Sequence, residues 1–126
     1  MREILFRGKR IKDGKWVYGY YFNVTIVGTN HYIKVPEGND LLVDPVTIGQ
    51  CTELTDKNGT RIFEGDIVRN GWTKSAETLT ISWDDKRACF VAKSDFSYRE
   101  AYVIAYECQV IGDIHDNPEL IKAEKQ

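Results

Sequence analysis

The stretch from Gln50 to Arg69 reads QCTELTDKNGTRIFEGDIVR, and it decides the fold of the half of the chain that contains it. Two turn signals, Asn58-Gly59 and Glu64-Gly65-Asp66, separate short runs of β-branched and aromatic residues. An Asn-Gly pair between such runs is typical of a tight β-hairpin, because both residues tolerate a positive φ. The pattern predicts a hairpin that enters a small antiparallel β-barrel.

The polar residues of this stretch can be explained by their roles in turns, without a catalytic role. The structural turn motif that we expect consists of Asp56, Asn58, Gly59, Gly65 and Asp66. Its aspartates are expected to accept hydrogen bonds from backbone N–H groups, and its glycines to supply positive φ. The alternative is an acid–base pair among these carboxylates, Glu64 and Asp113. We favour turn chemistry and predict no catalytic residue.

A second pattern is the aromatic strand near the N-terminus, where Trp16, Tyr18, Tyr20 and Phe22 alternate and are expected on one face. Tyr21 and Val17 are expected on the other face. The first interpretation makes these residues a core between an N-terminal hairpin and the barrel. The second makes Trp16, Tyr18, Tyr20, Tyr21 and Phe22 an interaction surface, since aromatic residues are favoured at interfaces. Because both faces are apolar, a homo-oligomer is one way to cover them.

Composition narrows the class of protein. The 126 residues carry a net charge of −2, with both signs interspersed, which disfavours general nucleic-acid affinity. The basic cluster Arg7, Lys9, Arg10, Lys12 and Lys15 is interpreted first as protection of an edge strand and second as a ligand contact. No apolar run is long enough to span a membrane, and charges near the N-terminus interrupt any signal core. We expect a cytoplasmic protein without a membrane partner.

Cofactor and metal sites are not expected. The three cysteines, Cys51, Cys89 and Cys108, lack the close pairing of a zinc site, and His31 and His115 do not complete one. No glycine-rich phosphate loop occurs either. The cysteines are interpreted as small buried apolar residues, reduced and free of metal.

The remaining chain predicts strands and little helix. In Thr78–Trp83 the residues Leu79, Ile81 and Trp83 alternate toward one buried face. Tyr102–Tyr106 is expected to be another strand, and Asn117-Pro118 starts a short C-terminal helix. The Asp44-Pro45 pair interrupts the strand pattern. We therefore place a short linker near residues 45–50 and divide the chain into residues 1–49, an antiparallel β-hairpin region, and residues 50–126.

Taken together, these motifs resemble the YopX family of small phage and prophage proteins. The resemblance rests on the 50–69 stretch, on VIGDIHDNPEL from Val110 to Leu120, and more loosely on REILFRG from Arg2 to Gly8. It implies an SH3-like barrel with a short C-terminal helix or tail in residues 50–126, and a bacterial host cell. It implies no particular activity.

Three functions are compatible with these observations. The favoured one is a non-enzymatic phage accessory protein that acts as a protein-interaction module, with an unknown polypeptide or a second copy as its partner. The alternative is a small nucleic-acid-binding β-barrel, by analogy of fold alone. An enzyme is the least favoured, because no residue set has the spacing of a catalytic or cofactor site.

Overall fold

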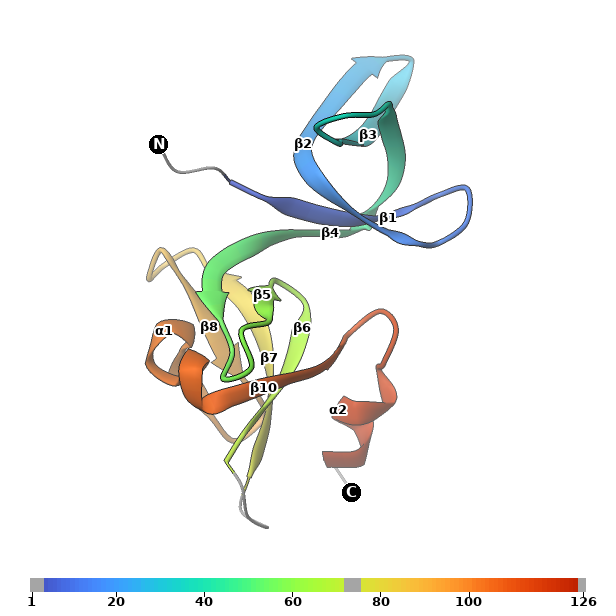
Figure 1. The fold of residues 1–126 in the computed structure, drawn as a ribbon. Helices are drawn as coiled ribbons and strands as arrows, with labels where there is room; N and C mark the ends of the chain where they lie inside the picture. Colours follow the sequence, from blue (N-terminus) through green and yellow to red (C-terminus); the bar gives the residue numbers. More distant parts are fainter. Residues whose placement is uncertain (1–3, 72–75, 125–126) are drawn as a thin grey trace. The chain divides into compact units, whose positions relative to one another are not determined.

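The computed structural model describes residues 4–71 and 76–124, and the chain divides into two units, Met1–Cys51 and Thr52–Gln126. Nearly all of the regular structure in these residues is antiparallel strand, with two short α-helices and one 3-10 turn. The mainly β class with little helix is therefore confirmed. Residues 45–50, where we expected a short linker, are part of β4 (Asp40–Thr55), which contributes to both units (Figure 1).

The first unit is a ring of four strands. β1 (Phe6–Arg10), β2 (Trp16–Ile26), β3 (Gly28–Lys34) and β4 pair in sequence, and β1 also pairs with β4. Pro45 is tolerated because it lies in a bulge, where the register moves from Arg7↔Gly49 to Lys9↔Asp44. The Thr47 hydroxyl accepts the Lys9 N–H at 2.8 Å inside that bulge.

The interior of this ring is small and depends on close backbone contact. Ile33 and Val43 are its fully buried apolar side chains. Gly8 faces Val43, and a Cβ on Gly19 would lie 2.1 Å from the Lys34 carbonyl oxygen. A side chain at position 19 would therefore separate β2 from β3. The ring closes because glycine stands where the strands approach most closely.

The second unit contains a five-stranded sheet in the order β10-β6-β7-β8-β9. The elements of this unit are β5 (Arg61–Phe63), β6 (Asp66–Asn70), β7 (Glu77–Asp84), β8 (Cys89–Lys93), β9 (Tyr98–Glu100), α1 (Ala101–Ile104), a 3-10 turn (Ala105–Glu107), β10 (Cys108–Asp113) and α2 (Glu119–Glu124). The short strand β5 pairs with the end of β4. The short helix after Asn117-Pro118 is confirmed as α2. The SH3-like assignment stays a prediction.

The core of this unit confirms most of the alternation expected for β7. Leu79 and Ile81 are buried, at 0% and 2% exposure, beside Ile62, Val68 and other apolar residues. The expectation for Trp83 is wrong, because its side chain is 45% exposed and packs edge-on against Phe90. Trp83 lies one residue before the end of β7, where the core no longer covers the sheet.

The strand expected at Tyr102–Tyr106 is also wrong, since this segment forms α1 and the 3-10 turn. Its buried residues, Ala101, Ile104 and Ala105, are spaced three and four apart, which is helical periodicity. Tyr102 and Tyr106 remain exposed.

Within the part of the chain that the structure describes, no helix has the length and hydrophobicity needed to cross a membrane.

Gly59 gives the first test of this fold. Its φ is +80° and a Cβ there would meet nothing within 4 Å, so substitution costs backbone strain alone. We expect Gly59→Val to lower the unfolding free energy by about 1–3 kcal/mol in urea denaturation. Thr60→Val is the control, because it introduces the same side chain in the same turn without a positive φ. Equal unfolding free energies for the two variants would contradict the assigned turn.

Candidate functional site

The aromatic strand is half exposed rather than buried as a core. On one face of β2, Tyr18 and Tyr20 are 46% and 44% exposed, and Trp16 and Phe22 are partly covered. The opposite face carries the buried Gly19, next to Ile33 in the ring interior. The interpretation of Trp16, Tyr18, Tyr20 and Phe22 as a closed core is therefore not supported within the first unit.

Each partly covered aromatic side chain has a specific neighbour. The Arg7 guanidinium and the Lys9 ammonium lie 4.4 and 5.4 Å from the centre of the Trp16 ring. Phe22 stacks on Tyr32 with ring centres 5.2 Å apart. These contacts pack Trp16 against β1 and Phe22 against β3, and they use part of the basic cluster for structure.

Tyr21 belongs to a separate polar contact on the other face of β2. Its hydroxyl lies 2.7 Å from His31 Nδ1, its ring stacks on the His31 ring, and Asn23 Nδ2 donates to the hydroxyl at 3.2 Å. The ring of Phe6 lies 5.7 Å away. Tyr21 thus fastens β2 to β3 and is a structural member of the aromatic set.

Beyond these contacts, β2 and β3 continue as a two-stranded hairpin arm, defined here as Asn23–Asn30. β1 pairs with β2 only at Trp16–Gly19, and β4 pairs with β3 only at Tyr32–Lys34. No third strand borders the arm in the described pairings. Its apolar tip is open to solvent, with Ile26 86% and Val27 96% exposed.

The arm has a sequence signal beyond the aromatic alternation. Between Lys15 and Lys34 the chain contains no Asp, Glu, Lys or Arg, although charged residues make up 29% of the protein. The two exposed tyrosines, Tyr18 and Tyr20, stand at the base of the same uncharged hairpin. The exposed, uncharged surface therefore continues from Tyr18 and Tyr20 along the arm to a tip that alternation alone does not reveal.

The turn motif is structural, as its residue types indicate. Asp56 is 4% exposed, and its carboxylate accepts the N–H groups of Asn58 at 2.8 Å, Thr60 at 2.9 Å and Val110 at 2.9 Å. The first two bonds close the turn around Gly59. The third joins this turn to β10, which is 54 residues away in the sequence. All three bonds favour the ionised carboxylate.

The other motif carboxylates are engaged in the same way. Asp66 is 2% exposed and accepts the Phe63 N–H at 2.7 Å across Gly65, whose φ is +89°. Asp113 accepts the N–H groups of His115 and Asp116 at 2.9 and 2.8 Å. These hydrogen bonds occupy the carboxylates that an acid–base pair would need.

The three cysteines are not paired with one another. Cys51 and Cys108 are buried, Cys89 is partly buried, and all three are free. Burial, and next the nearby Asp56 carboxylate, raise the pKa of Cys108 to about 11, so it is a thiol at neutral pH. Among residues 4–71 and 76–124, no group of three or more His, Cys, Asp or Glu side chains is arranged to hold a metal ion.

A groove that the sequence did not indicate lies on the second unit. Its volume is about 390 Å³, and its lining includes Thr78 and Thr80 of β7, Lys93 of β8, and Ile121 of α2. Phe96, in the turn between β8 and β9, also borders the groove and is 85% exposed. This volume suits a small ligand or a short segment of polypeptide.

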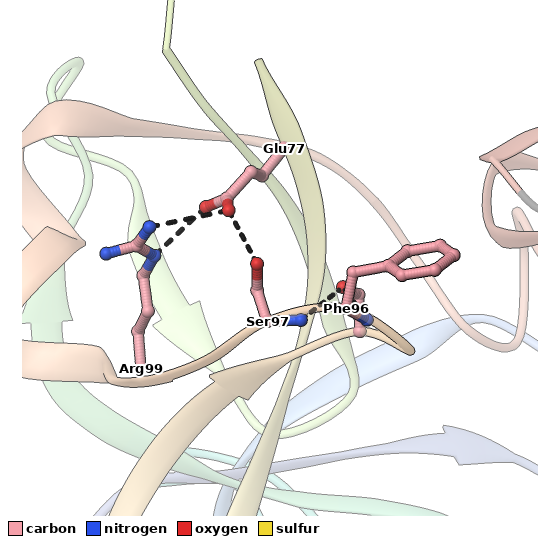
Figure 2. A network of polar contacts seen from close by, with 5 residues as sticks. Glu77, Phe96, Ser97 and Arg99 are labelled. Atoms are coloured by element: carbon pink, nitrogen blue, oxygen red, sulfur yellow. Dashed lines mark hydrogen bonds and ion pairs between the residues drawn. The ribbon is translucent and has the colours of Figure 1, made fainter. Parts of the chain in front are cut away.

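A polar network fixes the turn that carries Phe96. Arg99 Nε donates to Glu77 Oε2 at 3.0 Å, and the Ser97 hydroxyl donates to Glu77 Oε1 at 2.5 Å. The hydrogen bond from Arg99 is the main cause that lowers the pKa of Glu77, so this carboxylate is ionised at neutral pH. Figure 2 shows the Phe96 ring pointing away from this network.

Two comparisons with known proteins match most of the chain. The model of the family described as YopX protein matches residues 5–122. The crystal structure of protein EF1440 from Enterococcus faecalis is similar, with a TM-score of 0.60, 23% sequence identity, and coverage of 96% of this chain and 99% of that chain. At this identity the likeness concerns the fold alone. No curated protein matches the chain.

Asp56 gives the second test, through pH. Burial raises its pKa, but the hydrogen bonds from Val110, Thr60 and Asn58 outweigh burial and leave the pKa below the ordinary value. The resulting stability is present above the unfolded pKa of about 4 and is lost as pH falls through the lower folded pKa. Asp56→Asn should lower the unfolding free energy at pH 7 by about 1–3 kcal/mol, because one N–H loses its acceptor.

Urea denaturation at pH 7 and at acidic pH measures both effects. The variant should lose less stability than the wild type on acidification. Asp85→Asn, at an exposed carboxylate of the β7–β8 turn, is the control and should behave as the wild type does. An Asp56→Asn protein with wild-type stability and an unchanged pH dependence would show that the Asp56 carboxylate does not hold its turn to β10.

Proposed function

This chain belongs to the YopX family, and we propose that it is a phage or prophage accessory protein that binds another polypeptide without catalysing a reaction. It would act in the cytoplasm of the bacterial host. We assign binding to the hairpin arm and to Tyr18 and Tyr20 at its base. The observation that carries this proposal is the exposed apolar tip, Ile26 and Val27, on a hairpin without charged residues.

The composition of the arm matches what the centre of a protein interface requires. Interface centres are depleted of charge and enriched in aromatic residues, because charges are costly to remove from water. Tyr18 and Tyr20 supply the aromatic area, and Ile26 and Val27 supply side chains that a partner pocket can enclose. A charged surface of the same shape would favour water over a partner.

The same composition argues against nucleic acid as the partner of the arm. Affinity for nucleic acid rests on Lys and Arg that neutralise phosphates, and neither occurs between Lys15 and Lys34. A catalytic role receives no support from the motif, since Asp56, Asp66 and Asp113 hold backbone N–H groups. Polypeptide binding is the function that remains compatible with both observations.

The arm's geometry supports the same proposal. The threonine pair Thr25 and Thr29, with hydroxyl oxygens 2.9 Å apart, holds the strands together near the tip. A preformed tip lowers the entropy that binding must overcome.

Site-specific photo-crosslinking tests this function in the bacterial host. We expect p-benzoylphenylalanine at position 26 to give a discrete polypeptide adduct after irradiation, and Tyr20→Lys to weaken that adduct several-fold. The same group at position 46, where Val46 is 77% exposed in the same unit, is the control and should give none. Mass spectrometry identifies the adduct, and a second copy of this chain would be one form of the expected result.

Two results would overturn the proposal. The first is the absence of a polypeptide adduct that is specific to position 26. The second is crosslinking of position 26 to nucleic acid, together with binding of the purified protein to DNA at physiological salt. The Tyr20→Lys protein must retain the wild-type circular dichroism spectrum, so that a lost adduct reports binding and not unfolding.

A further inference from the structure

The turn that Asp56 closes contains an Asn-Gly pair, a dipeptide prone to spontaneous deamidation. In this reaction the Gly59 backbone nitrogen bonds to the side-chain carbonyl carbon of Asn58, the bond from that carbon to the carboxamide nitrogen breaks, and ammonia leaves with the Gly59 proton. Water then opens the resulting five-membered succinimide to aspartate or isoaspartate, each with one more negative charge than asparagine. Asn58 and Gly59 are both exposed, so water reaches them.

The class of this turn follows from its hydrogen bond and its dihedral angles. The Gly59 N–H donates to the Asp56 carbonyl oxygen at 3.0 Å, which closes a four-residue turn with Lys57 and Asn58 in the middle. Neither Lys57 nor Asn58 has a positive φ. Types II, I′ and II′ require a positive φ at one of these two positions, so the turn is type I.

A type I turn keeps the reacting atoms apart. Asn58 is its third residue, and ψ at that position is near 0°. The succinimide ring closes only when Cβ of Asn58 and the nitrogen of Gly59 are nearly eclipsed about the Cα–C bond, which requires a rotation of about 120° from this ψ. The folded turn therefore opposes a reaction that the sequence favours.

The Asp56 carboxylate resists that rotation. It accepts the N–H groups of Asn58 at 2.8 Å and Thr60 at 2.9 Å, on the two sides of Gly59. Rotating ψ of Asn58 would move Gly59 and Thr60 relative to Asn58, so their bonds to Asp56 would break. Deamidation thus requires the turn to open first.

We propose that Asn58 is a latent modification site, which Asp56 protects from deamidation, and that isoaspartate formation there opens the turn irreversibly. In isoaspartate the main chain runs through Cβ and Cγ of residue 58, so the turn is one carbon longer. The Gly59 N–H then cannot meet the Asp56 carbonyl oxygen in the same geometry. The new carboxylate also lies in the same turn as that of Asp56, and like charges repel.

A second Asn-Gly pair, Asn70-Gly71, provides an internal reference. Asn70 ends β6 and pairs with Glu77 and Cys108, so other contacts hold it. Because both asparagines precede glycine, they should react at comparable rates in the protein unfolded by urea. Differences between the two positions in the native protein therefore report the local structure.

Incubation of the full chain at mildly alkaline pH, with and without urea, tests the proposal. Peptide mass spectrometry quantifies aspartate and isoaspartate at positions 58 and 70. We expect native Asn58 to react at least about tenfold more slowly than in urea, because the reaction proceeds through local opening. Asp56→Asn should accelerate the native reaction at Asn58 several-fold, and more than at Asn70. Asp85→Asn, at an exposed carboxylate, is the control and should leave both rates unchanged.

Three results would overturn the proposal. The first is native deamidation of Asn58 at the rate seen in urea. The second is an Asp56→Asn protein whose Asn58 rate is unchanged, or whose two positions are accelerated equally, which would indicate general unfolding. The third concerns the isoaspartate form, separated by anion exchange through its extra charge. It should unfold at lower urea concentration than the unmodified protein, and equal stability would show that the turn closes again.

Discussion

The hydrogen bonds of Asp56 are the constraint on which the second unit depends. One buried carboxylate closes the turn around Gly59 and also accepts the Val110 N–H, so a local hairpin and the distant strand β10 share one anchor. Hydrogen bonds to a charged acceptor are stronger than neutral ones, and leaving any of these N–H groups unpaired is costly. The motif that resembles a reactive cluster is therefore the element that positions the sheet.

Because the motif is used for structure, the exposed apolar surfaces lie outside it. The uncharged hairpin arm belongs to the ring of the first unit, whereas the Phe96 groove lies on the sheet face opposite the core of the second. Each combines exposed apolar side chains with a support that fixes their position: Tyr21 and His31 below the arm, and the Ser94 hydroxyl that accepts the Phe96 N–H. Preorganisation of the arm would reduce the cost of binding a partner.

The parts of this structure that follow from local chemistry could be predicted from the sequence. Gly59, Gly65 and the turn bonds of Asp56 were predictable because they involve neighbours a few residues away. The bond from Val110 to Asp56 was not, because Val110 is 54 residues away in the sequence. Tyr102–Tyr106 was not, because a short apolar segment fits strand and helix periodicity alike. Trp83 was misplaced because alternation does not show where the core ends. The groove was invisible because residues 78–80, 93–96 and 121 meet only after folding.

Hydrogen–deuterium exchange of the Asp56→Asn protein at pH 7 tests whether this carboxylate holds its turn to β10. We expect faster exchange than in the wild type at the amides of Asn58, Thr60 and Val110, since these three lose a charged acceptor. Amides of the hairpin arm, in the other unit, should exchange at the wild-type rate. Unchanged exchange at Val110 would show that Asp56 does not join the turn to β10.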